Sequence, residues 1–322
     1  MTHLTSAWWR YTVALVVVFA VSSCARSPSP DGPPATAAGG PNAAARLTPT
    51  PTPTPTPEAD HAAPGTRLQA IQWDGKQRTY VVHAPQNYVP TRPMPLVIAL
   101  HYFPGNAEGM AFMTGLDAKA DKEGFIVAYP NGVNGSFNAL ICCNTTEDDV
   151  GFIKALIGRM KQVWKVDPDR IYATGISNGA DLSYRLAVEM PGVLAAIAPV
   201  SGGFMGRLVD GHPAYVPRTP VSVITFLGRL DGQFRRLEAG VATWRSRLGC
   251  TAGASAPVPS ASGVSRSTAR CRDGSEVVSY ALAGMPHAWP GGVQGGRLSD
   301  PTAGISATDL MWTFFAAHPR RS

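Results

Sequence analysis

Residues 171–190 constrain the fold of this chain more than any other stretch, because an apolar run there meets the pentapeptide GISNG at 175–179 and a helical pattern follows at once. A strand, a sharp turn and a helix in this order are the context that a nucleophile elbow requires. The glycines leave room for a tight backbone, so the Ser177 hydroxyl would project beside the amide groups of a helix N-terminus. The alternative is that Ser177 only caps that helix. The pattern makes Ser177 the candidate nucleophile.

The elements predicted around this turn alternate between strands and helices. Apolar runs predict buried strands at 96–102, 125–129, 171–176, 194–200, 221–227 and 276–282, the last of them being the final strand. Helices are predicted at about 105–122, from Asp148/Asp149 to about 166, after the elbow, and at 308–317, and a hairpin with its turn at Asp74-Gly75 precedes them all. This order predicts an α/β fold: a doubly wound, mostly parallel sheet with helices on both faces, the α/β-hydrolase layout.

A serine nucleophile needs a base, and in this layout the base follows the acid in the chain order Ser, Asp or Glu, His. Three histidines lie downstream of Ser177. His318 is in the terminal tail and His212 lies in a Pro/Gly loop that precedes the strand of the acid. His287 lies five residues beyond strand 276–282 and is the candidate base.

The acid is expected directly after strand 221–227, where Asp231 stands in FLGRLDGQ. Asp210 precedes that strand and Asp273 lies beyond Cys271, so both are poorer candidates. The alternative is that Asp231-Gly232 forms only a turn.

An oxyanion hole needs two backbone N–H donors aimed at the developing negative charge. One should be Asn178, the residue after the nucleophile, and the other the Phe103 amide in the loop that follows strand 96–102. His101 in the same loop is expected to be a packed support rather than a proton carrier. Tyr102 and Trp289 are candidates for contact with substrate, although Trp289 could equally be a buried brace for the histidine loop.

The segment from about 66 to 318 resembles the secreted esterase family that holds polyhydroxybutyrate depolymerases, feruloyl esterases and acetylxylan esterases. The matching pieces are LHYFPGNAEGM, AYPNG, CCN followed by DDVGF, DRIYATGISNGA, PHAWPGG and DLMWTFF. The resemblance implies Ser177 as nucleophile, Asp231 as acid and His287 as base. The family usually has His-Gly where this chain has His101-Tyr102, and a Cβ at 102 restricts the conformation of the oxyanion loop.

The N-terminus is expected to carry a targeting signal. An apolar run at 11–21 follows Arg10, is too short to span a bilayer, and ends in Val21-Ser22-Ser23-Cys24, which resembles a bacterial lipoprotein signal. Residues 1–23 would then be a signal peptide, Cys24 the lipidated first residue, 24–65 a Pro/Thr-rich disordered tether, and 66–322 the esterase domain. The alternative is an ordinary signal peptide with a cysteine there by chance. The expected location is extracytoplasmic, lipid-anchored to the cell membrane or secreted if the anchor is not used.

Five cysteines are present, and removing Cys24 for lipid leaves four in an oxidising compartment. Cys250 and Cys271 flank the segment 251–270, which has no strand or helix pattern, and are expected to form a disulfide. Cys142 and Cys143 are adjacent, so they either bridge each other or remain thiols.

The net charge of +6 comes from scattered residues without a Lys/Arg run or interleaved aromatics, which argues against a nucleic-acid partner. No metal-ligand spacing and no phosphate loop is present, so no cofactor is expected. The expected function is hydrolysis of short acyl, aryl or hydroxyalkanoate esters through an acyl-enzyme. The alternatives are a non-catalytic envelope lipoprotein that binds glycans or esters, and a peptidase on the same fold.

Overall fold

The computed structural model describes residues 62–143 and 146–320. These residues belong to one compact unit, Thr54–Ser322. The predicted signal peptide, Cys24 and all but the last four residues of the predicted tether lie outside the described residues.

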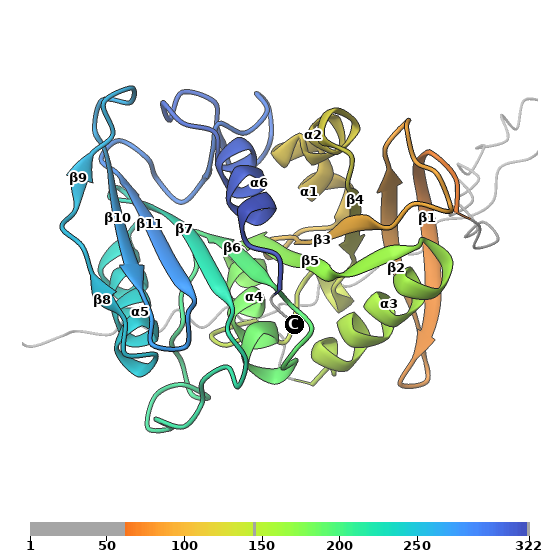
Figure 1. The fold of residues 1–322 in the computed structure, drawn as a ribbon, viewed down its shortest axis with the longest axis horizontal. Coiled ribbons are helices and arrows are strands. Elements are labelled where there is room, and N and C mark those ends of the chain that lie inside the picture. Colours follow the sequence, from red (N-terminus) through yellow and green to blue (C-terminus); the bar gives the residue numbers. More distant parts are fainter. Residues whose placement is uncertain (1–61, 144–145, 321–322) are drawn as a thin grey trace, which may run out of the picture. The chain divides into compact units, whose positions relative to one another are not determined.

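A large twisted sheet forms the centre of this unit (Figure 1). Its strands are β1 Gly65–Trp73, β2 Lys76–Ala84, β3 Met94–Leu100, β4 Ile126–Pro130, β5 Val166–Ile176, β6 Ala196–Val200, β7 Ser222–Gly228, β8 Thr251–Ala252, β9 Ala256–Pro257, β10 Val264–Arg270 and β11 Glu276–Leu282. They pair in the order β1-β2-β4-β3-β5-β6-β7-β11-β10-β8, with β9 beside β10. The run from β4 to β11 is parallel, whereas β1, β2 and β10 pair antiparallel with their neighbours. The predicted doubly wound, mostly parallel sheet is confirmed.

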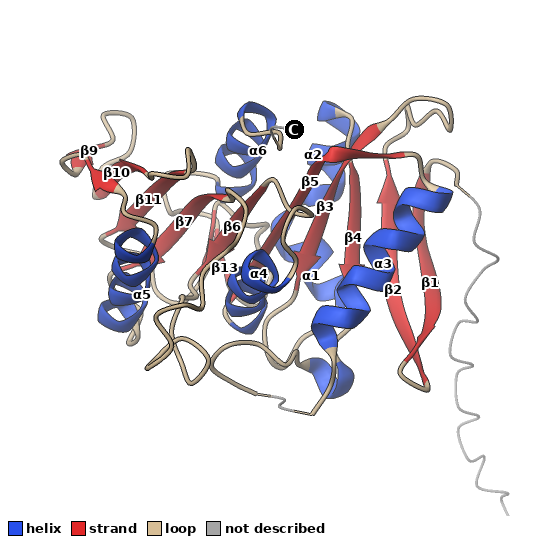
Figure 2. Cartoon of the chain, turned by 60° about the horizontal axis from the view of Figure 1, so that its bottom comes forward, coloured by secondary structure: helices blue, strands red, loops and turns tan. Residues whose placement is uncertain are grey.

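Helices cover both faces of this sheet. They are α1 Ala107–Thr114, α2 Leu116–Glu123, α3 Asp149–Val163, α4 Asn178–Glu189, α5 Phe234–Arg247 and α6 Ala307–Ala317. Helices α3, α4 and α5 lie on one face and α1, α2 and α6 on the other (Figure 2). Helix α3 begins where the sequence predicts, at Asp148 and Asp149. The Asp148 carboxylate caps it by accepting a hydrogen bond from the Gly151 amide at 2.9 Å.

The two core layers follow from strand periodicity. Successive side chains of a strand point to opposite faces, so a strand covered on both sides is apolar throughout. In β3, Leu96 and Ile98 pack into the layer under α3, α4 and α5, while Val97 and Ala99 pack into the layer under α1, α2 and α6. Burial of both faces fixes β3, β5, β6 and β7 in the middle of the sheet, and the loops at their carboxyl ends are the ones that carry the predicted site.

Three predictions of secondary structure need correction. The segment 251–270 is not irregular, because it contains β8, β9 and β10, and β10 forms an antiparallel hairpin with β11. The predicted helix at 105–122 is two helices, which break at Gly115 where the backbone φ is 62°. Strand 276–282 is not the last, since the two-residue strands β12 Trp289–Pro290 and β13 Ser299–Asp300 follow it.

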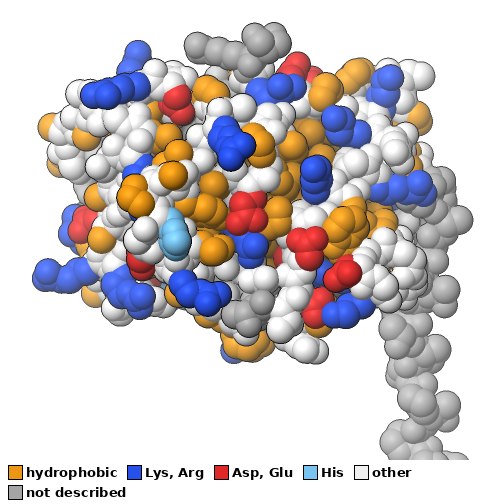
Figure 3. Space-filling view, turned by 90° about the horizontal axis from the view of Figure 1, so that it is seen from below, with side chains coloured by type: hydrophobic (Ala, Val, Ile, Leu, Met, Phe, Trp, Pro, Cys, Tyr) orange, Lys and Arg blue, Asp and Glu red, His pale blue; other side chains and the backbone are white. Residues whose placement is uncertain are grey.

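The surface agrees with the scattered charge seen in the sequence. On the face shown in Figure 3, Lys and Arg side chains are spread among acidic and apolar ones and form no continuous field. Within residues 62–143 and 146–320, no helix combines the length and apolar character needed to cross a bilayer.

Candidate active site

Ser177 lies in the turn between β5 and α4, as the pentapeptide predicts. Its backbone has φ of 56° and ψ of −120°, a combination that residues other than glycine rarely adopt. Backbone strain of this kind persists only where the surrounding structure holds it, and it concentrates at functional sites. Ser177 does not cap α4 with its side chain, so the capping alternative is not supported.

The two glycines of the pentapeptide are required by close packing. A Cβ on Gly175 would lie 2.5 Å from the Gly179 carbonyl carbon and 2.8 Å from the Leu100 carbonyl oxygen. A Cβ on Gly179 would overlap the Leu100 carbonyl group itself. The elbow therefore packs directly against the end of β3, which brings Ser177 beside the predicted oxyanion loop.

The predicted acid and base meet in the structure. His287 Nδ1 and Asp231 Oδ2 are 2.6 Å apart, and the other carboxylate oxygen of Asp231 accepts the Gln233 amide at 2.9 Å. The Asp231 side chain is 3% exposed and that of His287 is 28% exposed, so the acid is shielded while the imidazole reaches the surface. A buried carboxylate on Nδ1–H fixes the tautomer that leaves Nε2 free to accept a proton.

Ser201 joins the nucleophile turn to the histidine loop, and the sequence analysis missed it. The Ser177 amide donates to the Val200 carbonyl at 3.0 Å, and the next residue, Ser201, donates its hydroxyl to the Ala288 carbonyl at 3.2 Å. The end of β6 thus ties Ser177 to the residue beside His287. Among the described side chains, the Ser177 hydroxyl and the His287 ring form no hydrogen bond, and such contacts commonly tighten only in the substrate complex.

His101 supports the oxyanion loop, as expected. Its Nδ1–H donates to the Tyr102 carbonyl at 2.7 Å, and its Nε2 accepts the Gly132 amide at 3.0 Å, so the hydrogen-bond partners require the neutral ring. The side chain is fully buried, and burial lowers its pKa to about 4, with the Tyr102 carbonyl opposing that shift. Tyr102 itself has no positive φ, so the residue that replaces the family's glycine adopts ordinary backbone here.

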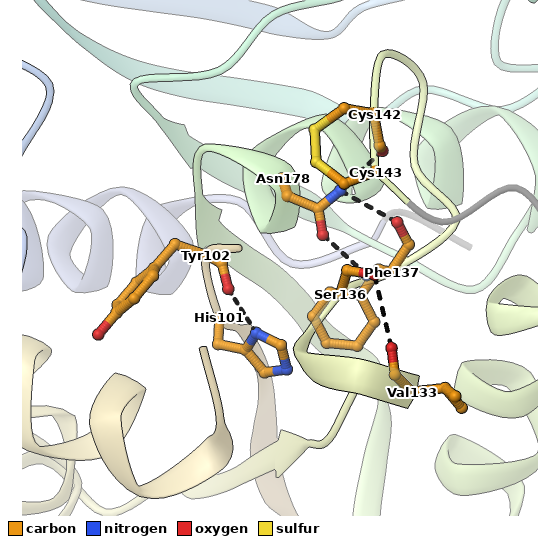
Figure 4. Close-up of a disulfide and its surroundings, with 8 residues drawn as sticks. All are labelled: His101, Tyr102, Val133, Ser136, Phe137, Cys142, Cys143 and Asn178. Atoms are coloured by element: carbon orange, nitrogen blue, oxygen red, sulfur yellow. Dashed lines mark hydrogen bonds between the residues drawn. A yellow bond between two sulfur atoms is a disulfide. The ribbon is translucent and has the colours of Figure 1, made fainter. Parts of the chain in front are cut away.

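Asn178, whose amide is the predicted oxyanion donor, uses its side chain to hold a neighbouring loop (Figure 4). Its Oδ1 accepts the Phe137 amide at 2.8 Å, while its Nδ2 donates to the Phe137 carbonyl at 3.0 Å and the Cys142 carbonyl at 2.9 Å. Cys142 is joined to Cys143 by a disulfide, which settles the choice between a bridge and two thiols. Only the Asn178 amide was predicted; no pattern in the sequence pointed to this clamp.

A second missed residue, Asp181, lies one helical turn beyond Ser177. Its amide donates to the Ser177 carbonyl at 3.0 Å, and its carboxyl oxygen accepts the Gly203 amide at 2.9 Å. The carboxyl is 5% exposed, and burial raises its pKa to about 8 despite the Gly203 hydrogen bond and the nearby Arg236. The buried Asp181 carboxyl, with its raised pKa, therefore couples the first turn of α4 to the loop after β6.

The two aromatic candidates for substrate contact are buried. Trp289 is 0% exposed and donates its indole N–H to Thr308 Oγ1 at 3.1 Å, so it braces the histidine loop against α6, and stacking on substrate is not supported. Tyr102 is 6% exposed and presents almost no surface to a ligand. The exposed aromatic in this region is Phe103, with 46% of its surface accessible.

In residues 62–143 and 146–320, no group of three or more His, Cys, Asp or Glu side chains is placed to hold a metal ion. The expected bridge between Cys250 and Cys271 is present.

The sheet order, the elbow after β5 and the loops at the carboxyl ends of β7 and β11 define an α/β hydrolase. The acetyl xylan esterase of Aspergillus awamori shares this fold with a TM-score of 0.53 and 17% identity, over 77% of this chain and 99% of that one. The family model described as esterase PHB depolymerase matches residues 79–215.

Relatives in sequence extend over most of the chain. It is 30% identical over 312 residues to a putative esterase, NocK, of Nocardia uniformis subsp. tsuyamanensis, which covers 94% of this chain and 86% of the relative. It is 29% identical over 249 residues to feruloyl esterase C of Emericella nidulans, over 74% of this chain and 84% of that protein. The chain belongs to this esterase family of polyhydroxybutyrate depolymerase and feruloyl esterase type, a family of carboxylic ester hydrolases.

Proposed function

We propose that this protein is an extracytoplasmic serine ester hydrolase that acts through an acyl-enzyme formed on Ser177. The observation that carries the proposal is the 2.6 Å contact between His287 Nδ1 and Asp231 Oδ2 in a chain whose elbow presents Ser177 at the same edge of the sheet. Membership of the esterase family gives the reaction class, and the geometry supports the assignment of its parts.

The proposed reaction has two halves. Ser177 Oγ attacks the ester carbonyl while His287 Nε2 takes the hydroxyl proton, and the same ring then returns this proton to the departing alcohol. In the second half, a water molecule attacks the acyl-enzyme in the same way, with His287 again taking and returning the proton, and the carboxylic acid is released. Asp231 remains ionised and stabilises the imidazolium that forms in each half.

The negative charge on the former carbonyl oxygen is assigned to two backbone amides, those of Phe103 and Asn178. Each such donor contributes roughly 2.7–4 kcal/mol to the transition state in a comparable site. Support comes from the elbow, because Gly175 and Gly179 pack against Leu100 and so bring the amide of Asn178 next to the loop that begins at His101.

The proposed substrates are short acyl or aryl esters, presented on a soluble or glycan-bound chain. A relative named feruloyl esterase and a structural neighbour named acetyl xylan esterase support aryl and short acyl groups. The exposed ring of Phe103, whose own amide is a proposed oxyanion donor, offers an apolar surface for such a group.

The location and the domain division are proposed on separate grounds. Two disulfides support an oxidising compartment outside the cytoplasm. A signal peptide over 1–23, a lipidated Cys24, a tether over 24–65 and a hydrolase domain over 66–322 would place the domain off a membrane surface. Cys24→Ala should move the protein from the membrane fraction to the soluble fraction; equal partitioning of variant and wild type would contradict the anchor.

Kinetics of triad variants test the proposed function. Ser177→Ala and His287→Ala should each lower kcat for 4-nitrophenyl acetate by roughly 10⁶-fold and Asp231→Asn by roughly 10⁴-fold. The triple variant should be hardly slower than Ser177→Ala, since the three groups act as a unit. Near-normal kcat in Asp231→Asn would move the acid elsewhere, and near-normal kcat in Ser177→Ala would leave a binding protein with adventitious hydrolysis.

A further inference from the structure

An open hollow of about 510 Å³ lies at the start of α5, beside the candidate active site. It is lined by Arg229, Asp231, Gly232, Phe234, Arg235, Arg236 and Glu238. Three of these seven residues are arginines from one short stretch of chain, and neither the proposed mechanism nor the sequence analysis gives them a role.

The arginines in this hollow form no ion pairs in the described part of the chain, and all three are exposed. Arg236 lies close enough to the buried Asp181 carboxyl to oppose the rise of its pKa. Of the two acids in the lining, Asp231 is already committed to His287 and to the Gln233 amide. Glu238 is the remaining acid, so the hollow has an excess of positive charge.

The backbone adds to this positive potential. Arg235 and Arg236 lie in the first turn of α5, a 14-residue helix that has no acidic residue in that turn. The amide groups at a helix N-terminus favour anions, so two cations there are placed unfavourably for the helix itself. Arg229 is steered to the same place, since its guanidinium lies over the Phe234 ring at 5.1 Å. An anionic ligand would offset the electrostatic repulsion among all three arginines and the helix N-terminus.

Backbone hydrogen bonds join the loop that lines the hollow to the loop of the candidate active site. The Arg229 amide donates to the Leu282 carbonyl at 2.9 Å and the Leu230 amide to the Met285 carbonyl at 3.0 Å, which fixes this loop to the one that carries His287. Asp231 lines the hollow and also bonds His287 in the proposed triad. The hollow therefore adjoins the proposed triad on the side of its acid.

We propose that the hollow formed by Arg229, Arg235 and Arg236 is a subsite for a carboxylate carried by the ester substrate. Guanidinium groups bind carboxylates through paired N–H···O bonds, and three of them on one wall favour an acidic group over a neutral one. The inference rests on the proposed ester hydrolysis and narrows its substrate class to acidic esters. The acid can stand on the acyl part or on the alcohol part, as in a uronic acid.

Two pairs of esters, each differing only in charge, separate these sources. Acyl-side acidity is tested with the 4-nitrophenyl monoester of adipic acid against that of adipamic acid. Alcohol-side acidity is tested with an acetylated methyl glycoside of glucuronic acid against the glucose counterpart. The wild type should favour the acidic member of at least one pair by about 1.5- to fivefold in kcat/KM, the range expected for a solvent-exposed ion pair. Equal kcat/KM within both pairs would overturn the proposal.

The arginines themselves are tested by a charge-matched comparison. The triple variant Arg229→Gln, Arg235→Gln, Arg236→Gln should bring the acidic-to-neutral ratio of kcat/KM close to one. The control variant Arg92→Gln, Arg270→Gln, Arg272→Gln removes the same charge from exposed positions at the opposite ends of the strands and should keep the wild-type ratio. Raising the ionic strength from about 0.01 M to about 0.5 M should shrink the ratio in wild type and control alike.

The test of the carboxylate subsite can fail without the test of the proposed serine mechanism failing. Hydrolysis of the neutral esters that disappears in Ser177→Ala upholds the serine mechanism whatever the ratio is. If the acidic preference survives in the triple variant, or falls equally in the control, the preference comes from overall charge and the subsite is refuted.

Discussion

The carboxamide of Asn178 and the backbone of Phe137 exchange a pair of hydrogen bonds, at 2.8 and 3.0 Å. The backbone amide of the same asparagine is the proposed oxyanion donor after the nucleophile. One residue thus both contributes to the proposed site and holds the loop that carries the Cys142–Cys143 bridge. Substitution of Asn178 should therefore affect both the position of the elbow and the stability of that loop.

Asn178→Ala should lower kcat for 4-nitrophenyl acetate by about 10- to 100-fold, a smaller loss than deletion of an oxyanion donor because the backbone amide remains. It should also reduce the free energy of unfolding by about 1–3 kcal/mol, since the Phe137 amide and carbonyl lose buried partners. Steady-state kinetics and urea denaturation measure the two effects. Asn87→Ala, at an exposed asparagine, is the matched control; an unchanged kcat in Asn178→Ala would show that the clamp does not position the elbow.

His101 should make stability fall in mild acid. Its pKa is about 4 in the folded protein and near 6.5 when unfolded, so the unfolded chain binds the additional proton between these values. The contribution of His101 is complete above pH 6.5 and is lost as the pH falls towards 4, by at most about 1.4 kcal/mol per pH unit. Urea midpoints across this range should fall less steeply in His101→Gln than in wild type. Parallel slopes would mean that the ring does not remain neutral in the folded state.

Asp181 should act in the opposite direction at higher pH. Its pKa is about 8 in the folded protein, against an ordinary value of 3.8, so the folded chain holds the additional proton between these values. Stability from this group is complete below about pH 4 and declines as the pH rises through 8. Asp181→Asn keeps an acceptor for the Gly203 amide and cannot ionise, so its urea midpoint should fall less than that of wild type between pH 6 and 9. A steeper fall in the variant would refute a protonated Asp181.

The Cys250–Cys271 bridge closes a loop over a sequence separation of 21 residues. On the chain-entropy model, a loop of this size is worth about 3 kcal/mol of unfolding free energy. Cys250→Ser with Cys271→Ser should lose about this amount in urea denaturation without a change in the KM for small esters. Mass mapping of unreduced peptides checks the pairing; either cysteine found free, or joined to Cys142 or Cys143, would contradict it.

The sequence predicted the middle of the fold because strands buried on both faces leave an unmistakable pattern. Apolar runs such as 96–102 and 221–227 lie within one or two residues of β3 and β7. Strand β10 was not predicted because it lies near the edge of the sheet. Of its residues only Val264 and Ala269 are buried, and the four residues between them are partly or fully exposed. An antiparallel edge strand needs few apolar residues, so its sequence resembles a loop.

The candidate site was predictable as far as chain order and spacing determine it. The GISNG turn, and the positions of Asp231 and His287 after their strands, required no knowledge of packing. The supporting contacts were not accessible in this way, because the Ser201–Ala288 and Asn178–Cys142 bonds join segments 87 and 36 residues apart. The role of Trp289 depended on burial, which its Pro/Gly-flanked sequence left open.

Covalent labelling tests the central claim, a nucleophilic Ser177, most directly. An aryl phosphonate ester reacts with an activated serine and leaves a stable adduct in place of the acyl group. Intact-mass measurement followed by peptide mapping should find one adduct on Ser177, growing in proportion to the loss of esterase activity and absent in Ser177→Ala. Full inactivation with Ser177 unmodified, or an adduct of equal yield in Ser177→Ala, would contradict the account.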